Sequence, residues 1–269
     1  MNNSKNKLKR FGYYLRLWGI MTKNAFLVYT TKKILISIFM LGKLLRFGFF
    51  LAFLFFIVQG SGSLAGYSIN QTMLFFLTFN LIDVIGQFLY REVYHFRGLI
   101  ITGGFDMVLT KPYNALFRVL MGGADVIDLM TIPPLIAGTI YVGQQLSPTS
   151  AQTLLYIMLL LNGLVIATAF HIAVASLGIV TLEIDHTVMI FRDLMNLGRF
   201  PIEIYREPIR GILTYLIPVG VMITIPAKVL FGIVSPLGVV ISLLVGALAI
   251  ILSVRFWNYA LRFYSSASS

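Results

Sequence analysis

Long apolar runs separated by short basic stretches constrain this chain more than any other feature of its sequence. A helix needs about 20 mostly apolar residues to cross the hydrocarbon layer of a membrane, and several segments meet that requirement. They are residues 36–58, 69–90, 114–142, 152–180, 209–226 and 237–257. Only 12% of the residues are charged, against about 25% in a soluble domain. The sequence therefore predicts an all-α polytopic membrane protein with about six transmembrane helices.

The distribution of Lys and Arg predicts how these spans are oriented, because cytoplasmic loops carry an excess of basic residues. Basic clusters occupy residues 1–33, the stretch between spans two and three, the stretch between spans four and five, and the C-terminal end. Residues 59–70 and 143–152 carry no charge. Six spans place every basic cluster on one side, so we expect both termini in the cytoplasm and one transmembrane domain over residues 1–269.

The net charge of +11 does not indicate nucleic-acid binding. The basic residues lie between apolar runs, where they set membrane topology, and do not gather in the single patch that nucleic-acid recognition requires. We therefore expect the lipid bilayer, and no nucleic acid, as the environment of the chain.

Three segments outside the spans carry further information. Residues 8–30 mix aromatic and basic side chains, as in a helix that lies in the membrane interface, so residues 1–33 are predicted to form a cytoplasmic or interfacial elbow. Residues 91–112 are too long for a plain turn between spans. Residues 183–207 are predicted to be a second cytoplasmic loop, partly amphipathic.

The sequence lacks the patterns of an enzyme that acts alone. It has no Gly-x-x-x-x-Gly-Lys-Ser/Thr stretch for nucleotide phosphates, no zinc-protease or Ser-hydrolase motif and no cysteine. Glu183, Asp185 and His186 come nearest to a metal cluster, but solvated charges are ordinary at the end of a span. We expect no catalytic residue and no metal site.

Polar residues within the spans are unusual, because a buried charge in lipid costs at least a few kcal/mol. Lys43 and Arg46 lie three apart on the first span, where they either snorkel to the headgroups or line a polar pathway. The remaining candidates for such a pathway are Asp83, Asp125, Asp128 and His171. They either form an ion or proton relay or pair inside the bundle with Lys43, Arg46 or the backbone; we favour pairing.

Short motifs resemble those of a known family. The stretch after span two contains Arg91-Glu92 and then Gly104-Phe105-Asp106-Met107-Val108-Leu109-Thr110-Lys111-Pro112. Its spacing of Gly, Asp, Leu and Pro resembles the coupling helix of ABC-2 type exporter permeases, and the Asp and Lys-Pro resemble a subfamily of small bacterial permeases of unassigned substrate. Two further elements are similar to that subfamily: Arg199-Phe200-Pro201 with Tyr205, and Ile225-Pro226-Ala227 with Gly232.

The resemblance implies an assembly and a source of energy. Such permeases have an elbow helix, six spans and a short cytoplasmic helix that docks into a separate ATPase subunit. Two ATPase chains and two permeases, a paralogous pair more often than identical copies, would form an exporter in the bacterial cell membrane. ATP and Mg would bind to the ATPase, so this chain is expected to be no enzyme and to bind no cofactor.

The resemblance also implies which residues couple the two subunits. Gly104 would allow a tight turn, Asp106 would stabilise the start of the helix, and Pro112 would end it. The apolar face expected to enter the partner's cleft consists of Phe105, Val108 and Leu109. The whole coupling set is Arg91, Glu92, Gly104, Phe105, Asp106, Val108, Leu109, Lys111 and Pro112. An ordinary amphipathic connector without a partner is the alternative for this segment.

Other functions remain open at this point. An ion- or proton-coupled carrier or channel would use the intramembrane Asp and His residues and would need no ATPase. An intramembrane enzyme would need a nucleophile with a base, or a set of metal ligands, and neither pattern is present. The substrate cannot be read from the sequence, although spans rich in Phe and Leu suit an amphipathic or lipid-like molecule.

Overall fold

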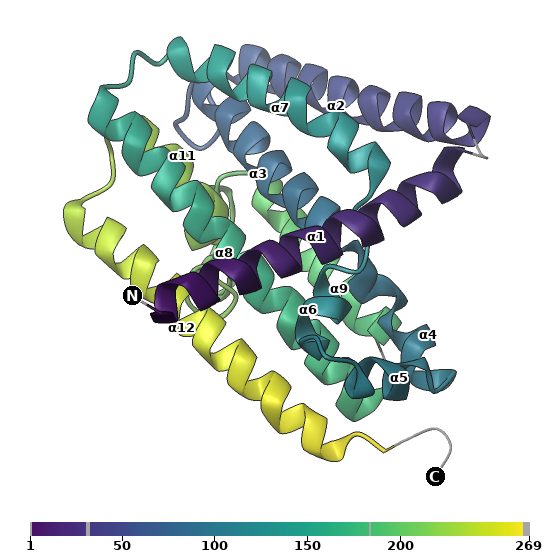
Figure 1. Ribbon diagram of the computed structural model, residues 1–269. Coiled ribbons are helices and arrows are strands. Elements are labelled where there is room, and N and C mark those ends of the chain that lie inside the picture. Colours follow the sequence, from purple (N-terminus) through teal and green to yellow (C-terminus); the bar gives the residue numbers. More distant parts are fainter. Residues whose placement is uncertain (1, 31–32, 183, 266–269) are drawn as a thin grey trace.

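The computed structural model describes residues 2–30, 33–182 and 184–265, and within these ranges the chain is helical with no β-strand (Figure 1). Five helical segments are long and apolar enough to cross a membrane. They are α2 (Lys33–Ser61), α3 with its continuation (Ile69–Ile101), α7 (Val126–Gln144), α8 (Ser150–Thr181) and α12 with its last turn (Pro236–Phe263). The prediction of an all-α polytopic membrane protein is confirmed.

Local sequence signals start several of these helices where hydropathy predicts them. Ser68 accepts a hydrogen bond from the backbone N–H of Gln71, whose side chain accepts from the backbone of Ser68, and Thr149 and Gln152 form the same capping box before α8. Such caps satisfy backbone N–H groups that a helix leaves free at its start. Ser235 caps α12, which begins with Pro236, a residue suited to the first turn of a helix.

The third predicted span is shorter than expected. Residues 114–142 divide into α6 (Ala115–Leu120) and α7 (Val126–Gln144), with an irregular stretch between them. Asp125 begins α7 by accepting a hydrogen bond from the backbone N–H of Ile127 at 2.8 Å. Residues 114–142 are apolar throughout, but they do not form one helix. Gly122 and Gly123, which disfavour helical conformation, lie where the helix is interrupted.

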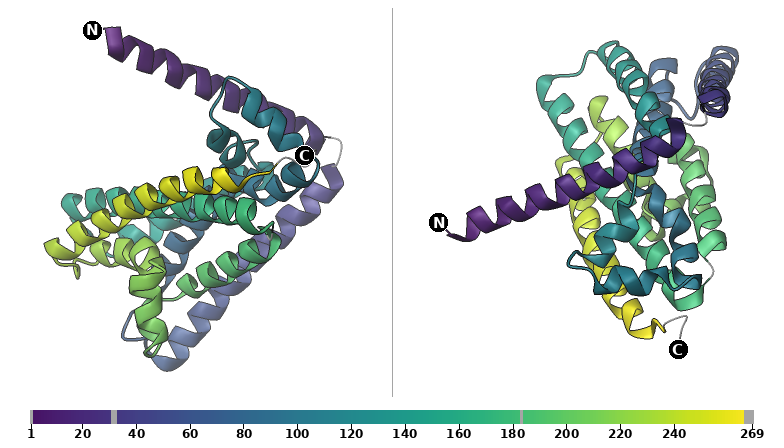
Figure 2. Two further views of the ribbon diagram at one scale, coloured as in Figure 1. Left: turned by 90° about the horizontal axis from the view of Figure 1, so that it is seen from below. Right: turned by 45° about the vertical axis from the view of Figure 1, so that its right-hand side comes forward.

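The two ends of the bundle carry different structures (Figures 1 and 2). At one end, which we call the α5 end, α3 continues through the 3-10 helix η1 (Arg91–His95) into α4 (Phe96–Ile101), α5 (Gly104–Thr110) and α6. The C-terminal end of α12 lies against these elements. The opposite end, which we call the loop end, holds the connections from α2 to α3, from α7 to α8, and into the start of α12.

The segment predicted to be a second cytoplasmic loop crosses the bundle instead. α9 (Ile184–Asn196) begins at the α5 end, where Asp185 pairs with Arg97 of α4. The chain continues through η2 (Leu197–Arg199) and η3 (Ile202–Ile204). Glu203 then forms an ion pair with Lys228 beside Tyr67 of the α2–α3 connection, at the loop end. The expectation that residues 183–207 stay on one side is therefore wrong.

The fifth predicted span, residues 209–226, is not one long helix. It consists of four short pieces: α10 (Ile209–Gly211), the π-helices η4 (Ile212–Leu216) and η5 (Gly220–Thr224), and α11 (Ile225–Leu230). Leu216 and Pro218 line a hollow with Ile166 of α8 and Leu248 of α12, whereas the Glu203–Lys228 pair holds the flanks at the loop end. The segment is thus a re-entrant hairpin that reaches into the bundle and returns to the same end.

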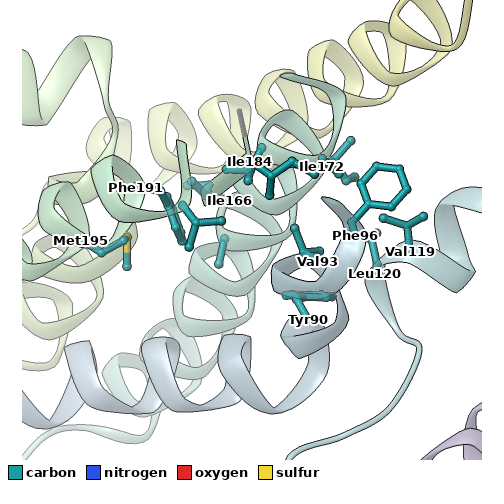
Figure 3. Close-up of a cluster of buried hydrophobic side chains, with 14 of the residues drawn as sticks. Tyr90, Val93, Phe96, Val119, Leu120, Ile166, Ile172, Ile184, Phe191 and Met195 are labelled. Atoms are coloured by element: carbon teal, nitrogen blue, oxygen red, sulfur yellow. The ribbon is translucent and has the colours of Figure 1, made fainter. Parts of the chain in front are cut away.

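One apolar core joins the crossing helices to the elements of the α5 end. Figure 3 shows part of it, with side chains contributed by α3, η1, α4, α6, α8 and α9. Phe96, Val93 and Val119 are fully buried there, together with Ile166 and Ile184. Because these residues come from segments far apart in the sequence, the core connects the α5 end to the crossing helices.

Helix α1 (Asn2–Thr30) lies across the bundle, not along it (Figure 2). Its contacts are at the α5 end: the Tyr14 ring lies 4.8 Å from that of Phe117, and the Tyr14 hydroxyl accepts a hydrogen bond from the backbone N–H of Asn114 at 3.0 Å. Trp18 packs edge-on against Phe88 of α3. This transverse placement fits the elbow that the mixed aromatic and basic composition predicts; its position in the membrane interface stays a prediction.

The crossing of α9 predicts on which side a cysteine at Ile204 reacts. The chain has no cysteine of its own, and Ile204 is exposed. Ile204→Cys should be labelled by an impermeant thiol reagent from the same side of intact cells as Ser61→Cys and Ser147→Cys, which we expect to be the outside. Thr110→Cys, at the α5 end, should stay unlabelled. Labelling of Ile204→Cys together with Thr110→Cys, and not with Ser61→Cys, would contradict the crossing.

Candidate functional site

Helix α5 is a short helix whose start and end are determined by a glycine and a proline in the sequence. Gly103 precedes it with φ of 71°, a left-handed conformation that glycine adopts without steric cost. After Thr110 the chain turns extended at Lys111, with ψ of 153°, as expected for the residue before a proline. Pro112 therefore has the predicted role, but the turn that was expected at Gly104 is made by Gly103.

Two apolar side chains of α5 point into their own chain. Phe105 is fully buried, and its ring lies 5.0 Å from the ring of Phe96 and 5.0 Å from that of Tyr264. Trp257 of α12 lies against the same ring, and Val108 is buried in the same core. The expectation that Phe105 and Val108 enter a partner's cleft is wrong, because both anchor α5 to the bundle.

The outer face of α5 carries the apolar side chains that remain available to a partner. Met107 is 69% exposed and Leu109 is 43% exposed, while the neighbouring Ile101 of α4 is also exposed. Lys111 lies at the end of this face. Leu109 thus keeps the position expected for a docking residue, and Met107 joins it; the sequence alone did not single out Met107, because spacing does not show which side of a seven-residue helix is covered.

Asp106 ties α5 to the end of the chain. Its Oδ1 accepts a hydrogen bond from the Tyr264 hydroxyl at 2.8 Å. Burial and the adjacent Asp106 carboxylate raise the pKa of Tyr264 to about 12, because ionising the phenol would lose solvation and place two negative charges together. Asp106 also lies in the first turn of α5, where a negative charge is favourable.

Arg91 and Glu92, expected to be part of the coupling set, form ion pairs inside the chain. The Arg118 guanidinium donates to Oε1 of Glu92 at 2.7 Å, and Nε of Arg91 lies 3.6 Å from Oδ2 of Asp125. These pairs connect η1 to α6 and to the start of α7. A Cβ at Gly122 would lie only 2.0 Å from the Arg118 guanidinium, so the glycine leaves room for this pair.

The charged residues of the spans are mostly paired, as we favoured. Lys43 of α2 forms an ion pair with Asp128 of α7, and Asp125 combines its cap with the Arg91 contact. His171 is buried, and its Nδ1 lies 2.7 Å from the backbone oxygen of Ala167. Asp83 has no ion-pair partner within 4 Å among the described residues, but four cations act on it electrostatically: Arg192, Arg46, Lys43 and Arg199.

The possible metal cluster near α9 is only partly described. Glu183 lies outside the described residues. Asp185 forms an ion pair with Arg97, through a hydrogen bond of 2.9 Å. In the part of the chain that the structure describes, no three His, Cys, Asp or Glu side chains gather as metal ligands.

Comparisons with known proteins identify the family of the chain. A family model described as "ABC-2 family transporter protein" matches residues 43–268. Searches among curated proteins and among solved structures returned no match. The matched range contains α5 and all the crossing segments except the start of α2.

The burial of Phe105 and the exposure of Met107 predict opposite effects on stability. Phe105→Ala should lower the free energy of unfolding by about 3–5 kcal/mol, because it leaves a cavity beneath α5. Met107→Ala on the same helix should change it by no more than about 0.5 kcal/mol. Thermal unfolding of the purified chain in detergent measures both, and equal stability of the two variants would show that Phe105 does not anchor α5.

Proposed function

The chain belongs to the ABC-2 transporter family, and from that membership we propose that it is the permease of an ABC exporter, driven through α5 by a separate ATPase subunit. The family supplies the general role, a membrane component of an ABC transporter. The observation that carries the finer proposal is the form of α5, which presents Met107 and Leu109 outward while Phe105 fixes it to the bundle.

A docking helix transmits force only if it moves together with the spans. Helix α5 meets this condition, because Phe105 contacts Phe96 of the α3 continuation and Trp257 of α12. Asp106 adds the hydrogen bond to Tyr264 beyond the end of α12. A displacement of α5 by an ATPase would therefore shift α12 and the end of α3, since packed cores move as rigid units and do not deform continuously.

The internal ion pairs at the α5 end would support coupling in a second way. Arg91–Asp125 and Glu92–Arg118 join η1 to α6 and α7. Because η1 lies between α3 and α4, movement at α4 and α5 would reach α7 through these pairs. Arg91 and Glu92 thus remain in the coupling set as residues that transmit movement inside the permease, without touching the ATPase.

The assembly that we propose contains two permeases and two ATPase chains in the bacterial cell membrane, with both termini of this chain in the cytoplasm. The second permease is a paralogue or an identical copy, and the subfamily favours a paralogue. ATP and Mg bind to the ATPase chains. Helix α9 supports a paired arrangement, because Asp193 is exposed on a crossing segment of the single chain, where lipid contact would be costly.

The mass of the detergent-purified complex tests the assembly. We expect a mass that corresponds to two permease and two ATPase chains, measured by native mass spectrometry or by light scattering. A fully active lone monomer would contradict the proposal.

Substitution of Leu109 tests α5 as the docking element. Leu109→Asp would place an unpaired charge in a desolvated cleft, and truncation of an interface anchor alone costs about 2 kcal/mol or more, roughly thirty-fold in affinity. We expect a normally inserted permease that no longer retains the ATPase on purification and supports no transport-linked ATP hydrolysis.

One control and one further test variant complete that experiment. Thr149→Asp, in the connection at the loop end, keeps a side chain that can cap α8 and should leave ATPase retention unchanged. Met107→Asp, on the same face as Leu109, should reduce retention. If Leu109→Asp and Met107→Asp both retain the ATPase with full transport, α5 is not the coupling element.

A further inference from the structure

Three arginines lie near enough to one carboxylate of the bundle to act on it electrostatically. Arg192 on α9, Arg46 on α2 and Arg199 in η2 all act electrostatically on Asp83 of α3. Arg46 and Arg192 also act on Arg199. Arg46 and Arg192 therefore both lie within electrostatic range of Arg199 and Asp83, although Arg46 is far from the other two arginines in the sequence.

The spacing of the residues explains how each segment contributes. On α2, Lys43, Arg46 and Phe50 lie at intervals of three and four residues, so they share one face of the helix. On α3, Phe79 and Asp83 are four apart and share a face in the same way. These two faces and the Arg192–Arg199 stretch meet at one place, since Arg199 contacts both Phe50 and Phe79.

Arg199 is held in position by aromatic rings and by a neighbour. Its guanidinium carbon lies 5.7 Å from the centre of the Phe50 ring and 5.6 Å from that of the Phe79 ring. The guanidinium also donates a hydrogen bond to Oδ1 of Asn196 at 2.7 Å. The centre of the Phe50 ring lies 4.5 Å from that of Phe76 of α3 and 5.6 Å from that of Phe200. These three rings form an aromatic surface beside the Arg199 guanidinium.

The local charge balance is positive. Lys43 and Asp128 neutralise each other as an ion pair, which leaves three arginines around the single carboxylate of Asp83. Arg46 and Arg192 repel Arg199 electrostatically, while Asp83 attracts it. Like charges at this depth are costly, so the cluster is most stable when an anion occupies it.

We propose that Arg46, Arg192 and Arg199 bind the anionic headgroup of an amphipathic molecule, whose apolar part lies against Phe50 and its aromatic neighbours. Arginine suits this role because its planar guanidinium binds phosphate and carboxylate oxygens in pairs. The proposal names the substrate class of the exporter and so rests on the proposed function. Arg46 and Arg192 are exposed on the single chain, which leaves their side chains accessible to such a headgroup.

Lipid binding to the full-length chain in detergent tests this proposal. Phosphatidylglycerol, phosphatidylcholine with the same acyl chains, and inorganic phosphate are compared by native mass spectrometry and by ligand-dependent thermal shift. We expect phosphatidylglycerol to bind at least tenfold more tightly than phosphatidylcholine, because the trimethylammonium group of phosphatidylcholine cancels the charge of its phosphate and would be repelled by the three arginines. Inorganic phosphate alone should bind weakly, because it lacks an apolar part that could contact the aromatic surface of Phe50, Phe76 and Phe200.

The preference should disappear when the three arginines are replaced. The variant Arg46→Gln, Arg192→Gln, Arg199→Gln should bind both lipids alike. A matched control replaces three exposed arginines outside the cluster by Gln, at Arg16, Arg255 and Arg262, and should keep the preference. Equal binding of both lipids by the unaltered chain, or an unchanged preference in the first variant, would overturn the proposal. Arginine-dependent binding of inorganic phosphate as tight as that of phosphatidylglycerol would also overturn it, because the ligand would then be a free anion.

A variant that is expected to strengthen binding keeps the proposal testable even if the triple variant does not fold. Asp83→Asn removes the one carboxylate of the cluster and keeps the size of the side chain. It should tighten the binding of phosphatidylglycerol several-fold while leaving that of phosphatidylcholine unchanged; weaker binding of phosphatidylglycerol would contradict the proposal.

The outcome can be separated from that of the proposed function. Lipid binding is measured on the permease without an ATPase, whereas the Leu109→Asp experiment measures ATPase retention. Absence of a lipid preference in the unaltered chain, together with normal ATPase retention, would reject the anionic headgroup alone. Normal lipid preference with no ATPase partner would reject the exporter and keep the binding site.

Discussion

The high cost of an unpaired charge in hydrocarbon organises much of this structure. Lys43 of α2 pairs with Asp128 of α7, and Arg91 of η1 lies beside Asp125 where α7 begins. These contacts determine where α7 starts relative to α2 and α3, because separating either pair would leave a charge without a partner. Helix boundaries that the apolar pattern leaves open are thus decided by the positions of a few charged side chains.

Pairing also separates structural charges from those that remain available for function. Asp125, Asp128 and His171 have partners that hold the fold, as do Arg91 and Glu92. Around Asp83 the balance is different, because three arginines from α2, α9 and η2 share one carboxylate. The proposed site is therefore the place in the described bundle where positive charge gathers in excess beside an aromatic surface.

Helix α5 is anchored to the bundle on one face and exposed on the other. Phe105 and Val108 pack into the main core, while Met107 and Leu109 face outward. This division serves a coupling role, since the buried side chains connect α5 to α12 and α3 and the exposed ones can contact a partner. The sequence predicted a short helix that ends before Pro112, but it expected the preceding turn at Gly104 instead of Gly103 and assigned two of the three expected docking side chains to the wrong face.

The sequence by itself determined the membrane class of the protein, four of the long crossing helices and the end of α5 before Pro112. These features depend on local composition and backbone chemistry, which neighbouring residues express without help. Only the tertiary structure decided that α9 crosses the bundle and that residues 209–230 form a re-entrant hairpin. One face of α9 packs on α8 and another carries Arg192 and Asp193. Because mean hydropathy averages over all faces of a helix, the sequence of α9 has the hydropathy of a loop. The burial of Phe105 and the meeting of Arg46, Arg192 and Arg199 were likewise hidden, because both arise from contacts between residues far apart in the chain.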